Sequence, residues 1–328
     1  MRLRLLQLLA IWIALGMTSA SARQLAATLS GPSLGYLWSG AEGKLRPLHG
    51  ILGNATIGDP MDLGFAITRA VALNGRHFLA SIDDNPALML LNMEKVPPTL
   101  TAVADAPETF SRIVGSRRGS AAALYDAGHQ RVVIVTGLPS SPGIAHTIDV
   151  PVFGDMLTRM AVSDEGDLLV YSLSATTRDL IYGWTPASGS RELTTAEGVS
   201  DIALAANGDA IVADPKANEI FSILDPRGSA ARQLLLDAEG GVSNPTGVIV
   251  SNANQLLLTN AGSQTIMTLD STGRLLRTER CSCELAGLFP LRDSVYRLSD
   301  RTDQTVFLLE AGPSGDRVLF VPMLRMKK

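Results

Sequence analysis

Two cysteines, Cys281 and Cys283, stand one residue apart and are the only cysteines in the 328-residue chain. This spacing allows a small disulfide ring, an inert turn, half of a soft-metal site, or a redox couple. An oxidising compartment favours the disulfide, and a ring this small is strained and more easily reduced. Two sulfur ligands alone do not complete a zinc site. The sequence therefore predicts a disulfide or inert turn at Cys281-Ser282-Cys283, with metal binding and redox activity as alternatives.

The histidines show no spacing typical of a metal site or a catalytic pair. They are His49, His77, His129 and His146, all in the first half of the chain. None forms an H-x-H or H-E-x-x-H motif. The sequence also lacks a phosphate-binding loop, a nucleophile elbow and a dinucleotide fingerprint. We predict no histidine-built active site, no cofactor and no metal.

Asp or Asn recurs where short apolar segments end. The positions are Asp83, Asp126, Asp214, Asn260 and Asp300. One interpretation is a ring of polar groups that holds a cation or a sugar. The other is that each side chain accepts a backbone N–H in its own turn, as Asx residues commonly do. We favour the second, because a residue repeated in every unit more often serves the unit than a ligand.

These residues are embedded in a repeat. From Val71 onward, two apolar and often β-branched segments joined by a Gly- or Asn-marked turn return about six times. The turns lie at Gly75, Gly119, Gly166, Gly208, Asn254 and Asp293. In the clearest unit, the segments 202–204, 210–213, 220–224 and 233–236 are predicted strands. A four-stranded unit with a period of roughly 40 to 50 residues predicts an all-β fold, the β-propeller.

Six full units are predicted, and a shorter piece precedes them. The units run over 65–103, 110–150, 156–194, 199–237, 246–277 and 285–321. Before them, 35–48 is predicted to be a hairpin that matches the third and fourth strands of a unit, with 25–30 as a further strand. We predict a seven-bladed propeller with an incomplete N-terminal blade. A six-bladed ring with an appended hairpin is the alternative.

The N-terminus has the features of a secretory signal peptide. Arg2 and Arg4 precede an apolar stretch, and Ala20-Ser21-Ala22 fits an A-x-A cleavage site. The alternative, an uncleaved anchor, needs about 20 apolar residues to span a bilayer, and the stretch is shorter. We predict a signal peptide over 1–22, cleaved near Ala22, and one domain over 23–328. The mature protein is then secreted or periplasmic, without a membrane span.

Composition also bears on the partners. The chain has a formal net charge of -4 and no clustered basic segment of the kind that contacts nucleic acid. We therefore predict no nucleic-acid partner, and expect a protein of the envelope or extracellular space, or a small ligand.

One stretch carries a family resemblance. Residues 201–214 read D-I-A-L-A-A-N-G-D-A-I-V-A-D, and Asn218-Glu219-Ile220-Phe221 follow. This resembles the NHL repeat, G-I-A-V-x-x-x-G-x-V-Y-V-A-D followed by N-x-R-I, and 244–248 with 258–260 match the same template. The chain is also similar to the YVTN-type surface and periplasmic propellers. The likeness covers two of the six units, and Asp201 replaces the first Gly of the pattern.

The resemblance implies candidate ligand-binding residues. Gluconolactonase-like propellers use Glu, Asn and Asp at the mouth of the central channel, and Asp201, Asn244 and Glu284 lie near first-strand starts here. Two functions follow. The favoured one is a binding or scaffold module for a protein or small ligand, without catalysis of its own. The alternative is a lactonase-like hydrolase or lyase with Ca²⁺ or another divalent cation in the central channel.

Overall fold

A computed structural model describes residues 32–83, 85–151, 156–299, 305–312 and 315–323. They belong to one compact unit, Pro32–Lys328. The predicted signal peptide with its cleavage site at Ala22, the predicted strand 25–30 and Asp300 lie outside the described residues.

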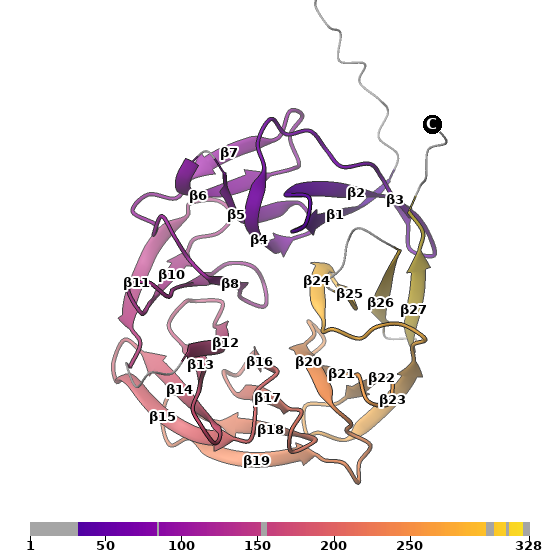
Figure 1. Ribbon diagram of the computed structural model, residues 1–328. Coiled ribbons are helices and arrows are strands. Elements are labelled where there is room, and N and C mark those ends of the chain that lie inside the picture. The colour runs from indigo at the N-terminus through magenta and orange to yellow at the C-terminus, as the bar shows by residue number, and fades with distance from the viewer. Residues whose placement is uncertain (1–31, 84, 152–155, 300–304, 313–314, 324–328) are drawn as a thin grey trace, which may run out of the picture. The chain divides into compact units, whose positions relative to one another are not determined.

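The described chain forms seven antiparallel sheets arranged in a ring, with no helix among the described residues (Figure 1). Blade 1 holds β1 (Ser33–Ser39), β2 (Lys44–Ile51) and β3 (Asn54–Ile57). Blade 2 holds β4 (Ile67–Asn74), β5 (His77–Ile82), β6 (Asn85–Asn92) and β7 (Thr99–Ala102). Blade 3 holds β8 (Arg112–Gly115), β9 (Ala122–Asp126), β10 (Arg131–Thr136) and β11 (Gly143–Asp149). Blade 4 holds β12 (Met156–Val162), β13 (Leu169–Ser174), β14 (Asp179–Thr185) and β15 (Gly189–Ala196).

The last three blades repeat the same plan. Blade 5 holds β16 (Asp201–Leu204), β17 (Ala210–Asp214), β18 (Glu219–Leu224) and β19 (Ala231–Leu236). Blade 6 holds β20 (Pro245–Val250), β21 (Leu256–Asn260), β22 (Thr265–Leu269) and β23 (Leu275–Arg280). Blade 7 holds β24 (Phe289–Arg292), β25 (Val295–Arg297), β26 (Val306–Gly312) and β27 (Gly315–Val321). The protein is a seven-bladed β-propeller, which confirms the predicted fold.

Turn chemistry explains why the units were visible in the sequence. In blade 5 the first two strands are joined through Asn207 and Gly208, and Gly208 has φ +91°, a backbone conformation that glycine adopts without steric cost. Asn207 Oδ1 accepts the N–H of Asp209 at 3.1 Å, which closes the turn. The strand ends of this blade agree with the sequence prediction to within two residues.

Blade 1 differs from the prediction in its orientation. The predicted hairpin exists as β1 and β2, but it does not correspond to the third and fourth strands of a unit, so that prediction is wrong. β1 contacts β24, the innermost strand of blade 7, and its residue Trp38 faces a cavity lined by first strands of other blades. The third strand is β3, which follows the hairpin and pairs with β2.

The hydrophobic core lies mainly between neighbouring blades. Between blades 5 and 6, for example, Ala203 and Ile211 of one sheet pack in the same cluster as Val248 and Leu256 of the next. Similar clusters fill the other blade interfaces, so each sheet buries its two faces against its two neighbours. The first strands are thereby held around the centre of the ring.

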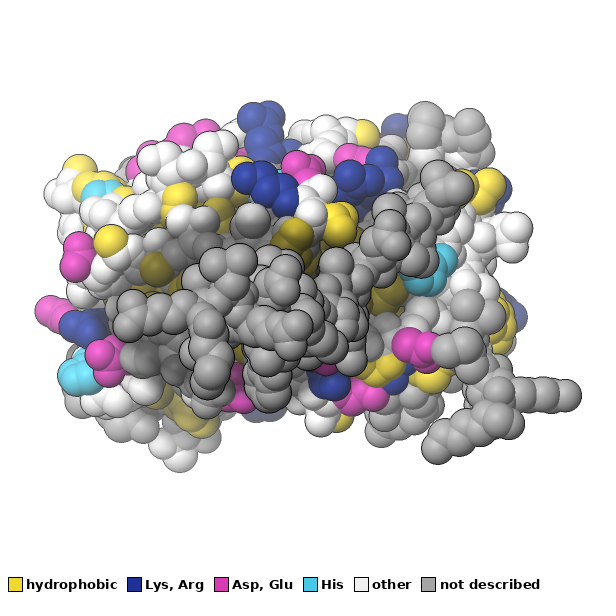
Figure 2. All heavy atoms as spheres, turned by 90° about the horizontal axis from the view of Figure 1, so that it is seen from above, with side chains coloured by type: hydrophobic (Ala, Val, Ile, Leu, Met, Phe, Trp, Pro, Cys, Tyr) yellow, Lys and Arg dark blue, Asp and Glu magenta, His cyan; other side chains and the backbone are white. Residues whose placement is uncertain are grey.

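The outer surface carries charges of both signs. On the side of the molecule that Figure 2 shows, Lys and Arg side chains are interspersed with Asp and Glu side chains and with hydrophobic groups. In the part of the chain that the structure describes, no helix is long and apolar enough to cross a membrane.

Candidate functional site in the central channel

The first strands of blades 2 to 6 begin with the same local structure. Each has a Ser or Thr whose hydroxyl group bonds to the second strand of its own blade. These residues are Thr68, Ser111, Thr158, Ser200 and Thr246. Ser200 Oγ lies 3.2 Å from Ala213 O and 2.7 Å from Pro245 O, so it also reaches the next blade. The hydroxyl groups fix where each first strand enters the ring.

In blades 2 to 5 the residue that follows this Ser or Thr lines the channel. In blades 2, 3 and 4 it is an arginine that donates to a backbone carbonyl of the following blade. The bonds run from Arg69 Nη1 to Ser111 O (3.0 Å), from Arg112 Nε to Leu157 O (3.1 Å) and from Arg159 Nε to Ser200 O. In blade 5 the residue is Asp201, whose Oδ2 accepts the N–H of Val248 at 3.0 Å. Four successive blades thus place a charged group at one level of the channel.

These four side chains line a cavity of about 280 Å³, together with Trp38 and neighbouring first-strand residues. We call this the arginine end of the channel. Arg69 is exposed, and Arg112, Arg159 and Asp201 are partly buried, so the cavity is open to solvent on the side of Arg69. Among the described residues, Asp201 is the only acidic group that lines it.

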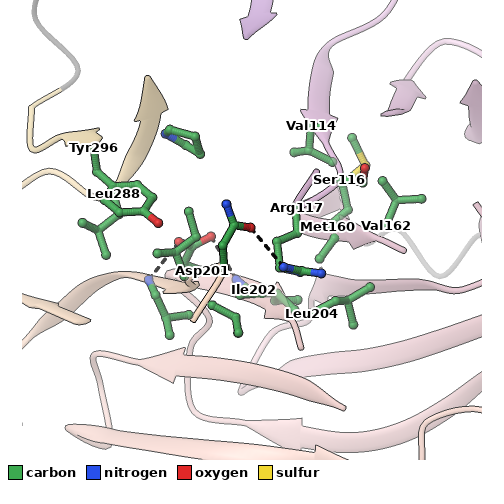
Figure 3. A pocket seen from close by; sticks show the side chains of 18 of the residues that line it. Val114, Ser116, Arg117, Met160, Val162, Asp201, Ile202, Leu204, Leu288 and Tyr296 are labelled. Carbon is green, nitrogen blue, oxygen red and sulfur yellow. Dashed lines mark hydrogen bonds between the residues drawn. The ribbon is translucent and has the colours of Figure 1, made fainter. Parts of the chain in front are cut away.

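A second cavity of about 210 Å³ adjoins the first and shares Val114, Met160 and Asp201 with it. Its walls combine aliphatic side chains with polar groups and come from first strands of blades 3 to 6 and from blade 7. Figure 3 shows Asp201 in the middle of this pocket, between Tyr296 and Leu288 on one side and Arg117 on the other. The two cavities form a continuous channel from the arginine end inward.

Arg117 crosses the opposite end of the channel, where turns join the first and second strands of the blades. Its Nη1 donates to Asn252 Oδ1 of blade 6 at 3.2 Å, and its Nη2 lies 3.4 Å from Asp164 Oδ2 of blade 4. Because Arg117 belongs to blade 3, these contacts span the ring. Arg117 therefore lies across this end of the channel.

Burial and neighbouring charges shift the pKa values of two groups at the arginine end, Asp201 and Arg112. Burial raises the pKa of Asp201 to about 6, against the opposing effects of the Val248 and Ile202 N–H groups and the charge of Arg159. Burial and the positive charges of Arg159 and Arg69 lower the pKa of Arg112. The three guanidinium groups therefore repel one another, and none of them forms an ion pair with a described acidic residue.

A larger groove, of about 510 Å³, lies on the turn side and is lined by Arg117, Arg118 and Arg227 together with acidic residues. Its charges are paired with each other: Asp164 contacts both Arg117 and Arg118, and Arg227 Nη2 lies 2.6 Å from Asp167 Oδ1. Such mutually neutralised pairs are typical of a solvated surface. The central channel is the stronger candidate, because its positive charges are not compensated in this way.

The structure places the predicted site residues in different surroundings. Asp201 lies on the channel. Asn244 is exposed and its N–H donates to Asn218 Oδ1 at 2.7 Å, and Glu284 is also exposed. Neither Asn244 nor Glu284 lines the two channel cavities. The structure therefore brings only one of the three residues to the channel.

Cys281 and Cys283 lie between β23 and β24, with Cα atoms 5.1 Å apart and their sulfur atoms in contact. Both side chains are buried in the cluster between blades 6 and 7 that includes Leu285 and Leu288. Neither lines the channel cavities. The disulfide stays a prediction, and the Cα separation lies within the range that a disulfide requires.

The recurrent Asx residues serve the backbone. Asp214 is fully buried and accepts four backbone N–H groups, two from its own turn and two from the segment that enters the blade. Asp126, Asp83 and Asn260 likewise accept backbone N–H groups.

The histidines are dispersed over blades 1 to 3. Within the described ranges, no three His, Cys, Asp or Glu side chains are grouped as a metal site would require.

Sequence reasoning missed Arg69, Arg112 and Arg159. A signal was present, since each follows a Ser or Thr at the same register position of successive units. An isolated Thr-Arg or Ser-Arg pair has no chemical meaning, however. The pattern indicates a site only when the units are aligned and the start of the first strand is known to face the channel.

No protein-family model matches this chain, and no curated protein matches it. Among solved structures it is similar to virginiamycin B lyase from Staphylococcus aureus, with a TM-score of 0.54 and 13% identity over 80% of this chain and 84% of that chain. It is also similar to a streptogramin B lyase, with a TM-score of 0.56 and 10% identity over 79% of this chain and 83% of that chain. A prolyl endopeptidase matches with a TM-score of 0.52 and 13% identity over 89% of this chain and 50% of that chain. At these identities the likeness shows the β-propeller fold, which hosts binding proteins and enzymes alike.

Proposed function

We propose that this chain is a β-propeller binding protein that takes a small ligand into its central channel and has no catalysis of its own. The observation that carries the proposal is the convergence of Arg69, Arg112, Arg159 and Asp201, from four successive blades, on one cavity. Concave sites with a few convergent polar groups beside apolar walls are the usual form of small-ligand sites. The aliphatic side chains of the second cavity supply such walls.

The cellular setting is part of the same proposal. The signal peptide over 1–22 and the likeness of blades 5 and 6 to NHL and YVTN repeats favour an exported propeller, secreted or periplasmic. The lactonase-like alternative needs Asp201, Asn244 and Glu284 around one cation. We do not extend that alternative, because only Asp201 lies on the channel.

Thermal unfolding in the presence of small molecules tests the proposal. Val114 lines both cavities and is partly buried, so the Val114→Phe variant fills the channel at their junction. We expect at least one compound in a set of anionic, neutral and cationic molecules to raise the unfolding midpoint of the wild type. A ligand at 100 times its Kd adds about 2.7 kcal/mol of stability. The variant should lose this rise.

Ile144→Phe is the matched control, because Ile144 is a partly buried aliphatic residue on β11 of the same blade and lines neither cavity. It should keep the ligand-induced rise. If no compound raises the midpoint of the wild type, or if Val114→Phe responds like the wild type, the channel is not a small-ligand site.

A further inference from the structure

We propose that the ligand of the central channel is a small anion with an apolar body, whose carboxylate, sulfate or phosphate group lies among Arg69, Arg112 and Arg159. This inference rests on the proposed function and names the ligand class of the same site.

The arginines keep unused donors. A guanidinium group has five N–H donors. Arg69 and Arg112 each use one N–H on a carbonyl of the next blade, and Arg159 uses two, one of them on Thr158 O at 2.8 Å. The remaining N–H groups have no partner among the described residues, and each guanidinium group is oriented by at least one bond to the backbone of the next blade. Held in this way, the arginines can bind planar or tetrahedral oxyanions with little loss of side-chain entropy.

The charge of the cavity is unbalanced. Three arginines and one aspartate line it, so its net charge is +2 with Asp201 ionised and +3 with Asp201 protonated. The mutual repulsion of Arg69, Arg112 and Arg159 is relieved when an anion lies between them. A cation or a neutral molecule offers no such relief.

A purely structural role does not explain three arginines. The alternative is that each arginine only stabilises the contact between neighbouring blades, since each donates a hydrogen bond to the next blade. Blade 5 makes the corresponding contact with a carboxylate, Asp201, and in blade 6 the equivalent residue is Gly247, which has no side chain. The ring closes in both cases, so contact between blades does not require arginine here.

The neighbouring cavity determines the rest of the ligand. Beyond Val114 and Met160 the channel offers aliphatic side chains, among them Val162, Leu204 and Leu288, beside the polar side chains of Ser116, Asn252 and Asp293. Arg117 lies across the end beyond them. A ligand whose anionic group lies among the arginines can therefore place its apolar body against these aliphatic side chains.

Calorimetric titration with defined probes tests the inference. The probes are ethyl sulfate, hexyl sulfate, hexyl phosphate, hexanoate and the neutral hexanol, at low ionic strength and pH 7.5. We expect the hexyl anions to bind and hexanol to bind at least tenfold more weakly, because charge-assisted hydrogen bonds are lost. Hexyl sulfate should bind more tightly than ethyl sulfate by about fourfold per added methylene group that is buried. The ranking of sulfate, phosphate and carboxylate identifies the preferred oxyanion.

Two substitutions should act in opposite directions, which separates binding from misfolding. Arg112→Gln should weaken hexyl sulfate binding about tenfold or more, and Asp201→Asn should strengthen it at pH 7.5 by removing a negative charge. Arg191→Gln is the matched control, because Arg191 also bonds to the next blade, at Pro226 O, but lies outside the channel cavities. It should leave the affinity within twofold of the wild-type value.

The pH dependence gives a further readout. The charged or titratable groups that line the channel around Asp201 are Arg69, Arg112, Arg159, Arg117, Asp293 and Tyr296. Since the pKa of Asp201 is raised to about 6, hexyl sulfate should bind more tightly at pH 5 than at pH 7.5 in the wild type, and the difference should shrink in Asp201→Asn.

The outcomes distinguish the inference from the proposed function. If hexanol binds as tightly as hexyl sulfate, or if Arg112→Gln binds hexyl sulfate within twofold of the wild type, the ligand is not selected by the arginines. The inference is then wrong, although the channel still binds small molecules. If no small molecule of any charge binds to the wild type, the proposed function itself fails.

Discussion

Asp201 is held in the fold at a cost in stability. Its pKa of about 6 lies above the ordinary value near 3.9, so the ionised carboxylate is less favourable in the folded than in the unfolded state. The protonated carboxyl group is accommodated in the fold without this cost, so Asp201 leaves the protein its full stability below about pH 4. The effect of this group then lowers the free energy of unfolding as the pH rises through 6 and the carboxyl group ionises. A charged group at this position is retained in spite of that cost, which agrees with a role in the channel.

The Asp201→Asn variant should accordingly be more stable than the wild type at pH 7.5, by about 1–3 kcal/mol, since one pKa unit corresponds to about 1.4 kcal/mol. The amide oxygen can still accept the N–H of Val248, whereas the N–H of Ile202, which bonds to Asp201 Oδ1 at 2.9 Å, loses its acceptor and reduces the gain. Urea unfolding at pH 7.5 and at pH 4 measures the difference, which should vanish at the lower pH. Asp59→Asn, at an exposed position outside the channel cavities, is the control. Equal stability of Asp201→Asn and the wild type at pH 7.5 would contradict the assigned cause.

At the scale of single residues, the sequence identified the role of Asp214 better than that of Arg112. A buried Asx residue at a strand end obeys a local rule of turn chemistry, which can be read from a few neighbours. Arg112 acquires its meaning from Arg69 and Arg159, each more than 40 positions away in the chain. Their convergence depends on the arrangement of three blades, and no local pattern specifies it.

Within a blade, Asp214 joins three elements. Its carboxylate accepts N–H groups of Lys216 and Ala217 in the turn after β17 at 3.0 and 3.1 Å. It also accepts N–H groups of Glu197 and Gly198, at 2.7 and 3.2 Å, in the connection that leads to β16. The connection between blades 4 and 5 is therefore fixed to the second strand of blade 5.

We predict that Asp214→Ala destabilises the protein by about 3–5 kcal/mol, because several buried N–H groups lose their partner at once. Urea or thermal unfolding measures the loss. Asp83→Ala is the matched control, because Asp83 is exposed and, among the described residues, accepts one backbone N–H, from Ala66 at 3.1 Å. It should cost about 1 kcal/mol or less. A similar loss in both variants would show that burial and bond number do not govern these positions.

Strand positions could be predicted from the sequence wherever the turns of one unit recur in the next. The turns of blade 1 do not recur in this way. Its hairpin has the right turn at Gly43, which has φ +62°, but a hairpin alone does not show whether it is the inner or the outer half of a sheet. That depends on the contact of β1 with β24 and on β3, a strand of only four residues. Both are tertiary features.

For the propeller as a whole, closure of the ring joins segments from opposite ends of the described chain. Blade 1 has three strands, and the outer side of β3 is completed by a parallel bridge between Ile57 and Met323. The N–H of Ile57 donates to Pro322 O at 3.0 Å, and Ile57 is fully buried. Residues after β27 thus extend from blade 7 onto blade 1, which protects the edge of an incomplete sheet.

Truncation tests this closure. Deleting residues 322–328 removes the backbone partners of Ile57 and should lower the free energy of unfolding by about 1–3 kcal/mol. Deleting only residues 324–328 keeps Pro322 and Met323 and is the matched control, since the two truncations differ in these two residues alone. Urea unfolding of both variants measures the difference. Because closure holds the first strands around the channel, the shorter chain should also bind hexyl sulfate more weakly than the control. Equal unfolding of the two truncations would mean that the ring is closed by the contacts of β1 with β24 and not by the C-terminal segment.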